Sequence, residues 1–167
     1  MSIDERAYSK EKIIPPHPLP AVSRKALKRV REPLPKPETC RYCGPEHPVR
    51  IARHEEIYGG REFGDWPFMY LCDHCGARVG VHPGTDIPIG MLADFYLRKA
   101  RSQNKPSFFQ MVKVTGMTMD EAYQWLADAM GIPKEECHWG WFEIDQCHQA
   151  GMICEEELRH NMRKKES

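Results

Sequence analysis

The sequence predicts an α+β fold, in which a small β-sheet is preceded by an extended N-terminal arm and followed by about four helices. Three observations predict it: two Cys-x-x-Cys pairs bracket a β-prone stretch, apolar residues recur at helical spacing after residue 85, and half of the 14 prolines precede residue 40. We therefore expect a flexible arm at residues 1–39, a sheet domain at residues 40–84 and a helical domain at residues 85–167.

The charges of the chain balance, with 24 Lys and Arg against 24 Asp and Glu, but they are unevenly placed. Basic residues exceed acidic ones by four in residues 1–39 and by one in residues 40–105, whereas acidic residues exceed basic ones by five in residues 106–167. Any attraction to nucleic acid must therefore come from the first two segments. No stretch approaches the ~20 apolar residues of a membrane span, and the N-terminus has no apolar leader, so we expect a cytoplasmic protein with reduced cysteines.

The arm combines two proline-rich stretches, residues 14–20 and 33–37, which favour polyproline II over a packed helix or strand. Between them lies a basic run that contains Arg24, Lys25, Lys28, Arg29 and Arg31. Apolar residues four apart in this run predict one or two helical turns with a cationic face. The run is either a solvated linker or a segment that becomes ordered on nucleic acid or on a partner protein. Few aromatic residues accompany it, so base stacking is poorly supported.

The strongest chemical signal is the doubled cysteine pair, Cys40-x-x-Cys43 and Cys72-x-x-Cys75, in which each second cysteine is followed by glycine. In such a turn two sulfurs converge on one ion, and the glycine adopts the positive φ that closes the turn. Two turns of this kind predict a tetrahedral Zn²⁺ site with four thiolates, in the manner of a zinc ribbon. Disulfides require an oxidising compartment, and a redox dithiol would leave the second pair without a role.

Short β-prone runs accompany the cysteines and predict a three-stranded sheet: residues 49–53, 66–71 and 78–82. Four thiolates on Zn²⁺ carry a formal charge of −2, which nearby arginines would balance; the alternative is that these arginines contact phosphate. The candidates are Arg41, Arg50, Arg53 and Arg78. The sequence leaves both alternatives open.

Two enzyme classes match the cysteine and histidine pattern in part. A zinc deaminase would use His54 with the second cysteine pair, but Leu71 stands where such enzymes have proline. A ββα-metal nuclease would use His74 or His82, but Asn and His do not follow at the expected spacing. A metal held by four protein ligands has no open position for water or substrate, so we expect a protein without catalytic activity.

The sequence predicts that the helical domain begins near Thr85, which would cap the first helix, with Pro88 in its first turn. Apolar residues from 89 to 100 then recur on one helical face. Arg98 and Arg101 lie off that face, next to Phe95, and form the expected cationic edge. This edge is either a nucleic-acid surface or an ordinary solvated face.

Three further helices are predicted after residue 105: residues 106–114, a helix capped by Thr118 and Glu121 and ended by Gly131, and residues 144–163. The capped helix carries acidic residues and no Lys or Arg, which is the wrong charge for a DNA-reading helix. The remaining cysteines and two histidines are either core residues or a second metal site; they are Cys137, His138, Cys147, His148 and Cys154.

Several short motifs occur along the chain in a specific order. They are Cys40-x-x-Cys43-Gly44, Tyr58-Gly59 with Gly64, Cys72-x-x-Cys75-x-Ala77-x-Val79-Gly80-x-His82, Pro88-x-Gly90-x-Leu92-Ala93-Asp94, Leu97-Arg98 with Arg101, Tyr123-x-Trp125-Leu126-Ala127, and His138 with Phe142 and Cys147. In these motifs, which span about two-thirds of its length, the chain resembles a zinc-ribbon-containing family of unknown function found in bacteriophage and bacterial genomes. The family usually has a His followed by Phe-Asp-x-Leu-Trp where this chain has Asn104-Lys105 and then residues 108–112.

The resemblance implies a metal-binding protein that is not secreted, points to a phage origin and thus to the host cytoplasm, and implies no reaction. We expect an accessory protein that binds nucleic acid, or a nucleic-acid-processing complex, through the basic run of the arm and the edge formed by Arg98 and Arg101. A protein-protein adaptor or inhibitor of host machinery is the alternative. A zinc-dependent nuclease or deaminase-like enzyme is the further alternative.

Overall fold

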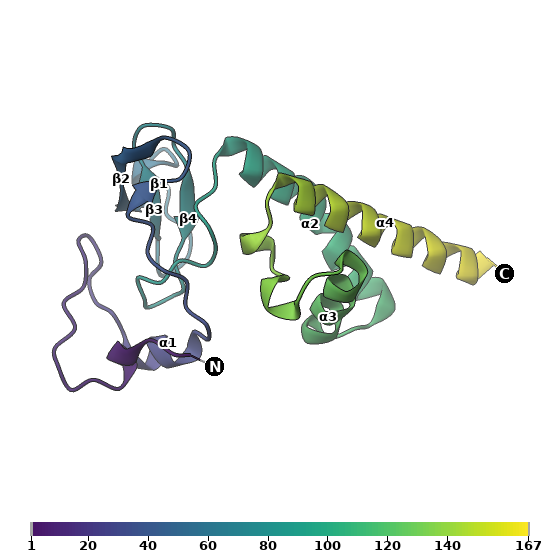
Figure 1. The fold of residues 1–167 in the computed structure, drawn as a ribbon, viewed down its shortest axis with the longest axis horizontal. Coiled ribbons are helices and arrows are strands. Elements are labelled where there is room, and N and C mark those ends of the chain that lie inside the picture. The colour runs from purple at the N-terminus through teal and green to yellow at the C-terminus, as the bar shows by residue number, and fades with distance from the viewer. Residues whose placement is uncertain (1, 167) are drawn as a thin grey trace. The chain divides into compact units, whose positions relative to one another are not determined.

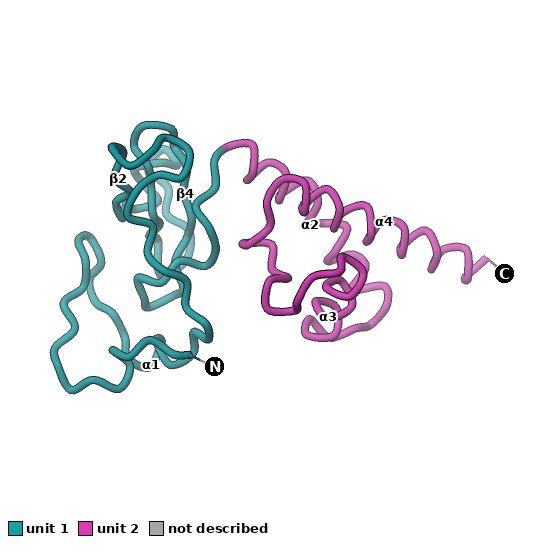
Figure 2. Tube along the Cα trace, viewed as in Figure 1, with its two compact units in different colours: residues 1–94 teal, residues 95–167 magenta. Residues whose placement is uncertain are grey.

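A computed structural model describes residues 2–166 of the chain. Four strands follow the short helix α1 and precede the long helices α2 to α4 (Figure 1). The chain divides into two compact units, residues 1–94 and residues 95–167 (Figure 2). The first unit contains the sheet and the second contains the long helices, which confirms the α+β class.

The sheet is antiparallel and its strands lie in chain order: β1 (Thr39–Cys40), β2 (Gly44–Arg53), β3 (Phe68–Cys72) and β4 (Arg78–Gly80). Val49 of β2 lies opposite Cys72 of β3, and Leu71 of β3 lies opposite Arg78 of β4. The sequence predicted three strands. The additional strand, β1, has only two residues and pairs with the beginning of β2 through the turn that contains the first cysteine pair.

Strand β3 is buried along its whole length, so it is the centre of the first unit. Its side chains pack with those of the neighbouring strands and of the segments on either side of the sheet in one apolar cluster: Leu19, Cys40, Ile51, Phe68, Tyr70, Cys72, Ala77, Val79, Val81 and Leu92. Leu19 comes from the N-terminal segment. The proline-rich segment therefore contributes to the core of the sheet unit.

Helix α1 (Arg24–Arg29) holds the middle of the N-terminal segment against the sheet unit. The hydroxyl of Ser23 caps the helix by accepting a hydrogen bond from the Ala26 N–H at 3.2 Å. Leu27 is fully buried in a second apolar cluster with Ala7, Val30 and Ile87. Gly84 lies so close to α1 that a Cβ atom built on it would be 2.9 Å from the Cβ of Ala26.

A buried carboxylate fastens the two ends of the same segment. Asp86 is 0% exposed and accepts two hydrogen bonds from Arg6, at 2.7 and 3.1 Å. Lys36 forms a second ion pair with Asp86 at 2.5 Å. The segment that composition marks as flexible is thus anchored to the sheet unit near both of its ends and at α1.

The helix predicted to begin at Thr85 does not form there. Thr85 instead closes a turn, in which its hydroxyl donates to the His82 carbonyl and accepts from the Ile87 N–H. Residues 87–93 run beside β4, with bridges from Val81 to Pro88 and from Arg78 to Ala93. Leu92 of this extended segment packs into the sheet core, whereas Ile89 is exposed, so the helical spacing of the apolar residues was misleading.

The second unit is built from α2 (Phe95–Thr115), α3 (Met119–Met130) and α4 (Ile144–Glu166). Helix α2 passes through Pro106, whereas the sequence predicted a break there; the ring removes one helical N–H donor without ending the helix. The predicted capping box of α3 is present: Thr118 accepts from the Glu121 N–H, and Glu121 accepts from the Thr118 N–H. Gly131 ends α3 in the left-handed conformation, as predicted.

Two 3-10 helices, Lys134–Glu136 and Trp139–Trp141, connect α3 to α4. The core between the three long helices contains the largest fully buried side chains of this unit: Leu97, Phe108, Met111, Leu126, Cys137 and Phe142. Cys147 and Cys154 of α4 are also fully buried. Among residues 2–166, none of the helices combines the length and the hydropathy of a membrane span.

Candidate metal centre

Two tight turns at one end of the sheet carry the four cysteines predicted as ligands. Cys40 ends β1 and Cys72 ends β3, while Cys43 and Cys75 follow in the turns. Gly44 and Gly76 have φ values of 105° and 79°, so each turn is closed by the glycine that the sequence predicted. In the second turn the Gly76 N–H donates to the Cys72 carbonyl at 2.9 Å.

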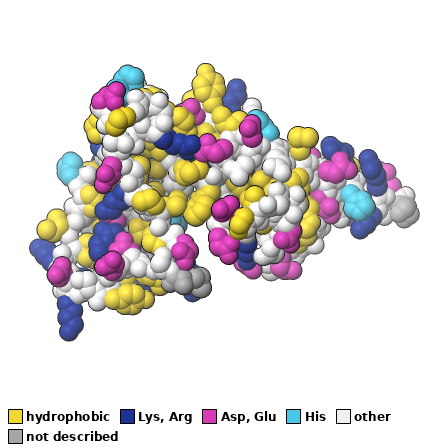
Figure 3. Space-filling view, in the orientation of Figure 1, with side chains coloured by type: hydrophobic (Ala, Val, Ile, Leu, Met, Phe, Trp, Pro, Cys, Tyr) yellow, Lys and Arg dark blue, Asp and Glu magenta, His cyan; other side chains and the backbone are white. Residues whose placement is uncertain are grey.

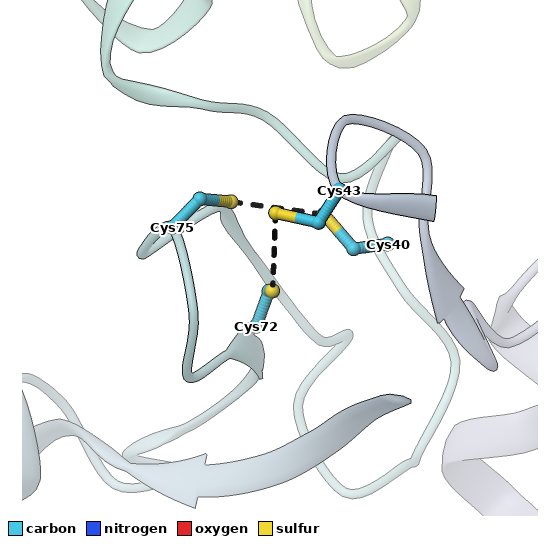
Figure 4. A group of neighbouring side chains, drawn as sticks. All are labelled: Cys40, Cys43, Cys72 and Cys75. Carbon is cyan, nitrogen blue, oxygen red and sulfur yellow. Dashed lines mark hydrogen bonds between the residues drawn. The ribbon is translucent and has the colours of Figure 1, made fainter. Parts of the chain in front are cut away.

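The four sulfur atoms point toward one another (Figure 4) and all lie within 4.8 Å of one another. The Sγ atoms of Cys40 and Cys75 are 3.7 Å apart, and those of Cys43 and Cys72 are 4.0 Å apart. A tetrahedral Zn²⁺ with Zn–S bonds of about 2.3 Å requires sulfur separations of roughly 3.8 Å. These separations are also far too long for disulfide bonds. The four residues therefore fit a metal ion with four thiolate ligands.

The pKa values of two thiols in the cluster are shifted in opposite directions. Desolvation, together with hydrogen bonds among the neighbouring thiols, raises the pKa of Cys43 to about 12. Burial also acts to raise the pKa of Cys40, but hydrogen bonds from the backbone N–H groups of Tyr42 and Cys43 outweigh it and lower that pKa. A divalent cation would remove this conflict, because it stabilises every thiolate that binds it.

Two of the four arginines considered for charge compensation, Arg50 and Arg53, are paired with carboxylates. Arg50 donates to Asp73 at 2.7 and 2.9 Å and to Glu56 at 3.1 Å. Arg53 donates to Glu62 at 2.7 Å, and the Arg78 guanidinium lies 5.1 Å from the ring centre of Tyr58. His74 contacts the sulfur cluster: its Nδ1 is 3.3 Å from Sγ of Cys43, and the His47 ring packs on the His74 ring.

Two of the three histidines considered for enzyme chemistry, His54 and His82, lie away from the sulfur cluster. His54 accepts a hydrogen bond from the Phe63 N–H in the loop beyond β2. His82 is half-buried, and desolvation lowers its pKa. Among the described residues, the group that can hold a metal consists of the four cysteines alone.

The second metal site considered for the helical domain is not formed in the described part of the chain. Cys137, Cys147 and Cys154 are fully buried, but they and the two histidines do not gather as ligands. Burial raises the pKa of Cys137 to about 11 and that of Cys154 to about 12. These thiols are neutral core residues.

The predicted cationic edge of α2 is not formed either. Arg101 is only 9% exposed, and its guanidinium donates to the carbonyls of Gly140 and Phe142 at 2.9 and 3.2 Å. Arg98 is partly buried. Arg101 therefore stabilises the second unit, because its hydrogen bonds join α2 to the segment that connects α3 and α4.

The basic run of the N-terminal segment does reach the surface. Its five basic residues are all exposed: Arg24, Lys25, Lys28, Arg29 and Arg31. Arg24 donates to the backbone carbonyls of Ser9 and Glu11, and Lys28 lies over the Tyr8 ring. Lys25 and Arg29 form no ion pair with any described residue. All five basic residues of the run therefore lie at the surface of the first unit.

Comparison with known proteins supports the metal centre. No curated protein and no solved structure matches the chain. Residues 36–157, which include all four clustered cysteines, match the model of a family of zinc-finger-containing domains. Because this match covers well over half of the 167 residues, the chain belongs to the family of zinc-finger-containing domains.

Proposed function

We propose that this protein is a non-catalytic accessory protein that binds nucleic acid through the cationic face of α1, with Zn²⁺ stabilising the sheet that carries it. The observation that supports this most is the placement of α1. Its apolar side is fixed by Ala26 and Leu27, so its basic side must face solvent. Cations held in a fixed array lose less entropy on meeting a phosphate backbone than cations on a mobile tail.

The arrangement of charge on α1 suits a backbone of phosphates. Residues 24 and 28 lie one turn apart, and so do residues 25 and 29, which gives two short parallel rows. Arg31 extends the array past the end of the helix. Salt-dependent, sequence-independent binding follows from such contacts, because each neutralised phosphate releases counterions. We expect little discrimination among sequences, since contacts to backbone phosphates carry no sequence information.

The metal has a structural role in this proposal. Cys40, Cys43, Cys72 and Cys75 would hold Zn²⁺, which supplies a cross-link between the turns after β1 and β3. With four protein ligands the ion keeps no open position for water or substrate. The sheet so fixed positions Ile87 and Asp86, the two residues on which α1 and its flanks are docked.

The test is a titration of a short fluorescein-labelled DNA duplex, and of a single-stranded RNA, with the zinc-loaded protein at several salt concentrations. Engagement of four cations predicts a slope of log affinity against log salt of roughly −3.6 on duplex DNA. Lys25→Glu with Arg29→Glu should reduce affinity at least tenfold and flatten this slope. Lys113→Glu with Lys165→Glu makes the same change of net charge on exposed positions of the second unit.

The two double variants separate a local site from a general charge effect. The proposal is refuted if both variants weaken binding equally, or if the full-length zinc-loaded protein binds neither probe at low salt. In the second case the alternative of a protein-protein adaptor takes its place, and the same α1 variants then serve to map its partner.

A further inference from the structure

Helix α4 carries a stripe of side chains that are exposed to solvent. The stripe recurs at intervals of four and three residues, the spacing of side chains on one face of a helix that pairs with another helix: His148, Met152, Glu155, Arg159, Met162 and Glu166. All six are exposed, and the two methionines are 69% and 62% exposed. Ser107 and Asn104 of α2 border the stripe through hydrogen-bonding contacts with Glu155 and His148.

Figure 3 shows acidic and basic side chains mixed along the end of the chain that leads to the C-terminus. The six stripe residues are placed symmetrically about residue 157, so each has a counterpart at the same distance on the other side. The two members of each such pair are either complementary in charge or both methionine. If a second α4 is laid antiparallel over the first, Met152 faces Met162, and Glu155 faces Arg159. His148 then faces Glu166. Every charged position of the stripe meets a residue that can pair with it, and every methionine meets a methionine.

A groove next to the stripe offers a place for the apolar side chains. It has a volume of about 550 Å³ and is lined by Trp125 of α3 and by one side of α4, including Met152 and Ile153. In the antiparallel arrangement, Met162 of the second copy lies over Met152 at the edge of this groove. Methionine is flexible enough to fit such a shallow apolar site.

We propose that the protein forms a symmetric homodimer through antiparallel pairing of the α4 stripes. An interface of this kind uses the same surface on both copies, so each favourable contact occurs twice. The paired region from residue 148 to residue 166 is about 27 Å long at 1.5 Å per residue. Because four methionines supply most of its apolar contact, we expect a reversible dimer with a dissociation constant of roughly 10–100 µM.

The experiment measures the molar mass of the full-length, zinc-loaded protein by sedimentation equilibrium across that concentration range, with a reducing agent present. Glu155→Arg and Arg159→Glu should each raise the dissociation constant at least tenfold, because each places two like charges opposite each other on both sides of the centre of the interface. An equimolar mixture of the two variants should form a heterodimer within about threefold of the wild-type affinity, since opposite charges then face each other again.

The mixture distinguishes pairing between copies from an effect within one helix. Within one copy, Arg159→Glu also removes the contact of Arg159 with Glu156, and Glu155→Arg removes the contact of Glu155 with Ser107. Mixing the two variants cannot restore either contact. Glu135→Arg, an equal change of charge at an exposed position outside α4, should dimerise like the wild type. A wild-type protein that stays monomeric overturns the proposal, as do single variants that dimerise normally or a mixture that stays monomeric.

Discussion

The ion pair between Arg6 and Asp86 should be worth several times more than a surface ion pair of similar length. Asp86 is fully buried, and Arg6 contacts both of its carboxylate oxygens, the shorter contact being 2.7 Å. Arg159 and Glu156 of α4 are 2.9 Å apart, but both are exposed. The two pairs have similar shortest N–O distances but differ in burial and in the number of contacts, so a comparison between them tests whether the buried pair is the stronger one.

The size of the coupling free energy between Arg6 and Asp86 depends on how far each partner is exposed to water. Removing one member of a fully buried pair costs about 3–5 kcal/mol, but Arg6 keeps about a third of its side-chain exposure and a second partner, Asp4. We therefore expect a coupling free energy between Arg6 and Asp86 of about 2 kcal/mol. For the exposed pair of Arg159 and Glu156 the expected value is about 0.5 kcal/mol or less.

The assay is a double-mutant cycle with Arg6→Gln and Asp86→Asn, measured by urea unfolding at constant free zinc. The indole N–H of Trp66 donates to the Thr85 carbonyl next to Asp86, so its NMR signal reports on the first unit alone. A parallel cycle with Arg159→Gln and Glu156→Gln, followed by helical circular dichroism, is the control. Equal coupling energies in the two cycles would refute the argument that burial strengthens this pair.

Three further predictions concern pH, the metal and a helix cap. Burial acts to raise the pKa of Asp86, but hydrogen bonds from Arg6 and Lys36 outweigh it and hold that pKa below its ordinary value of 3.8. The ion pairs therefore stabilise the fold above about pH 4, and this contribution is lost as the pH falls through the lowered pKa of Asp86. The unfolding free energies of the wild type and of Asp86→Asn should accordingly converge in acid. A difference between them that stays constant down to pH 2 would contradict this prediction. Removing Zn²⁺ with a chelator, or replacing Cys75 by Ser, should unfold the sheet unit, because zinc supplies about 10–16 kcal/mol in small modules. The helical circular dichroism of the second unit should remain largely intact. A Trp66 NMR signal that persists in the metal-free protein would contradict this prediction. Thr118→Ala should destabilise the second unit by about 1 kcal/mol, because the cap of α3 is lost. Ser102→Ala, at an exposed position of α2, is the control, and thermal unfolding measures the effect of both substitutions.

Signals carried by adjacent residues were read correctly from the sequence. The cysteine pairs with their glycines predicted the sulfur cluster, because a Cys-x-x-Cys turn brings its own sulfurs together whatever surrounds it. Thr118 and Glu121 predicted the beginning of α3 for the same reason, since a capping box is a contact within one turn. The pairing of the two cysteine turns was predictable because one pair has too few sulfurs for a metal site.

Features that depend on distant partners were not predictable. The helical spacing of apolar residues after Thr85 also fits an extended segment against β4, and only the bridges to Arg78 and Val81 decide between the two. Arg101 has the sequence context of a surface residue, but its hydrogen-bond partners lie about forty positions further along the chain. The anchoring by Asp86 joins residues 80 positions apart, and no local motif indicates it.

The anchor for the N-terminal segment has a consequence during synthesis of the protein. Asp86 emerges from the ribosome 50 residues after Lys36, which corresponds to roughly 3–10 s of translation. During that interval the basic run has no docking surface, while ribosomal RNA lies close by. Cys75, the last of the four clustered cysteines, precedes Asp86 by only 11 residues, so capture of a metal and docking of the segment become possible almost together. A nascent chain deprived of zinc would keep its cations undocked at a polyanionic surface after release.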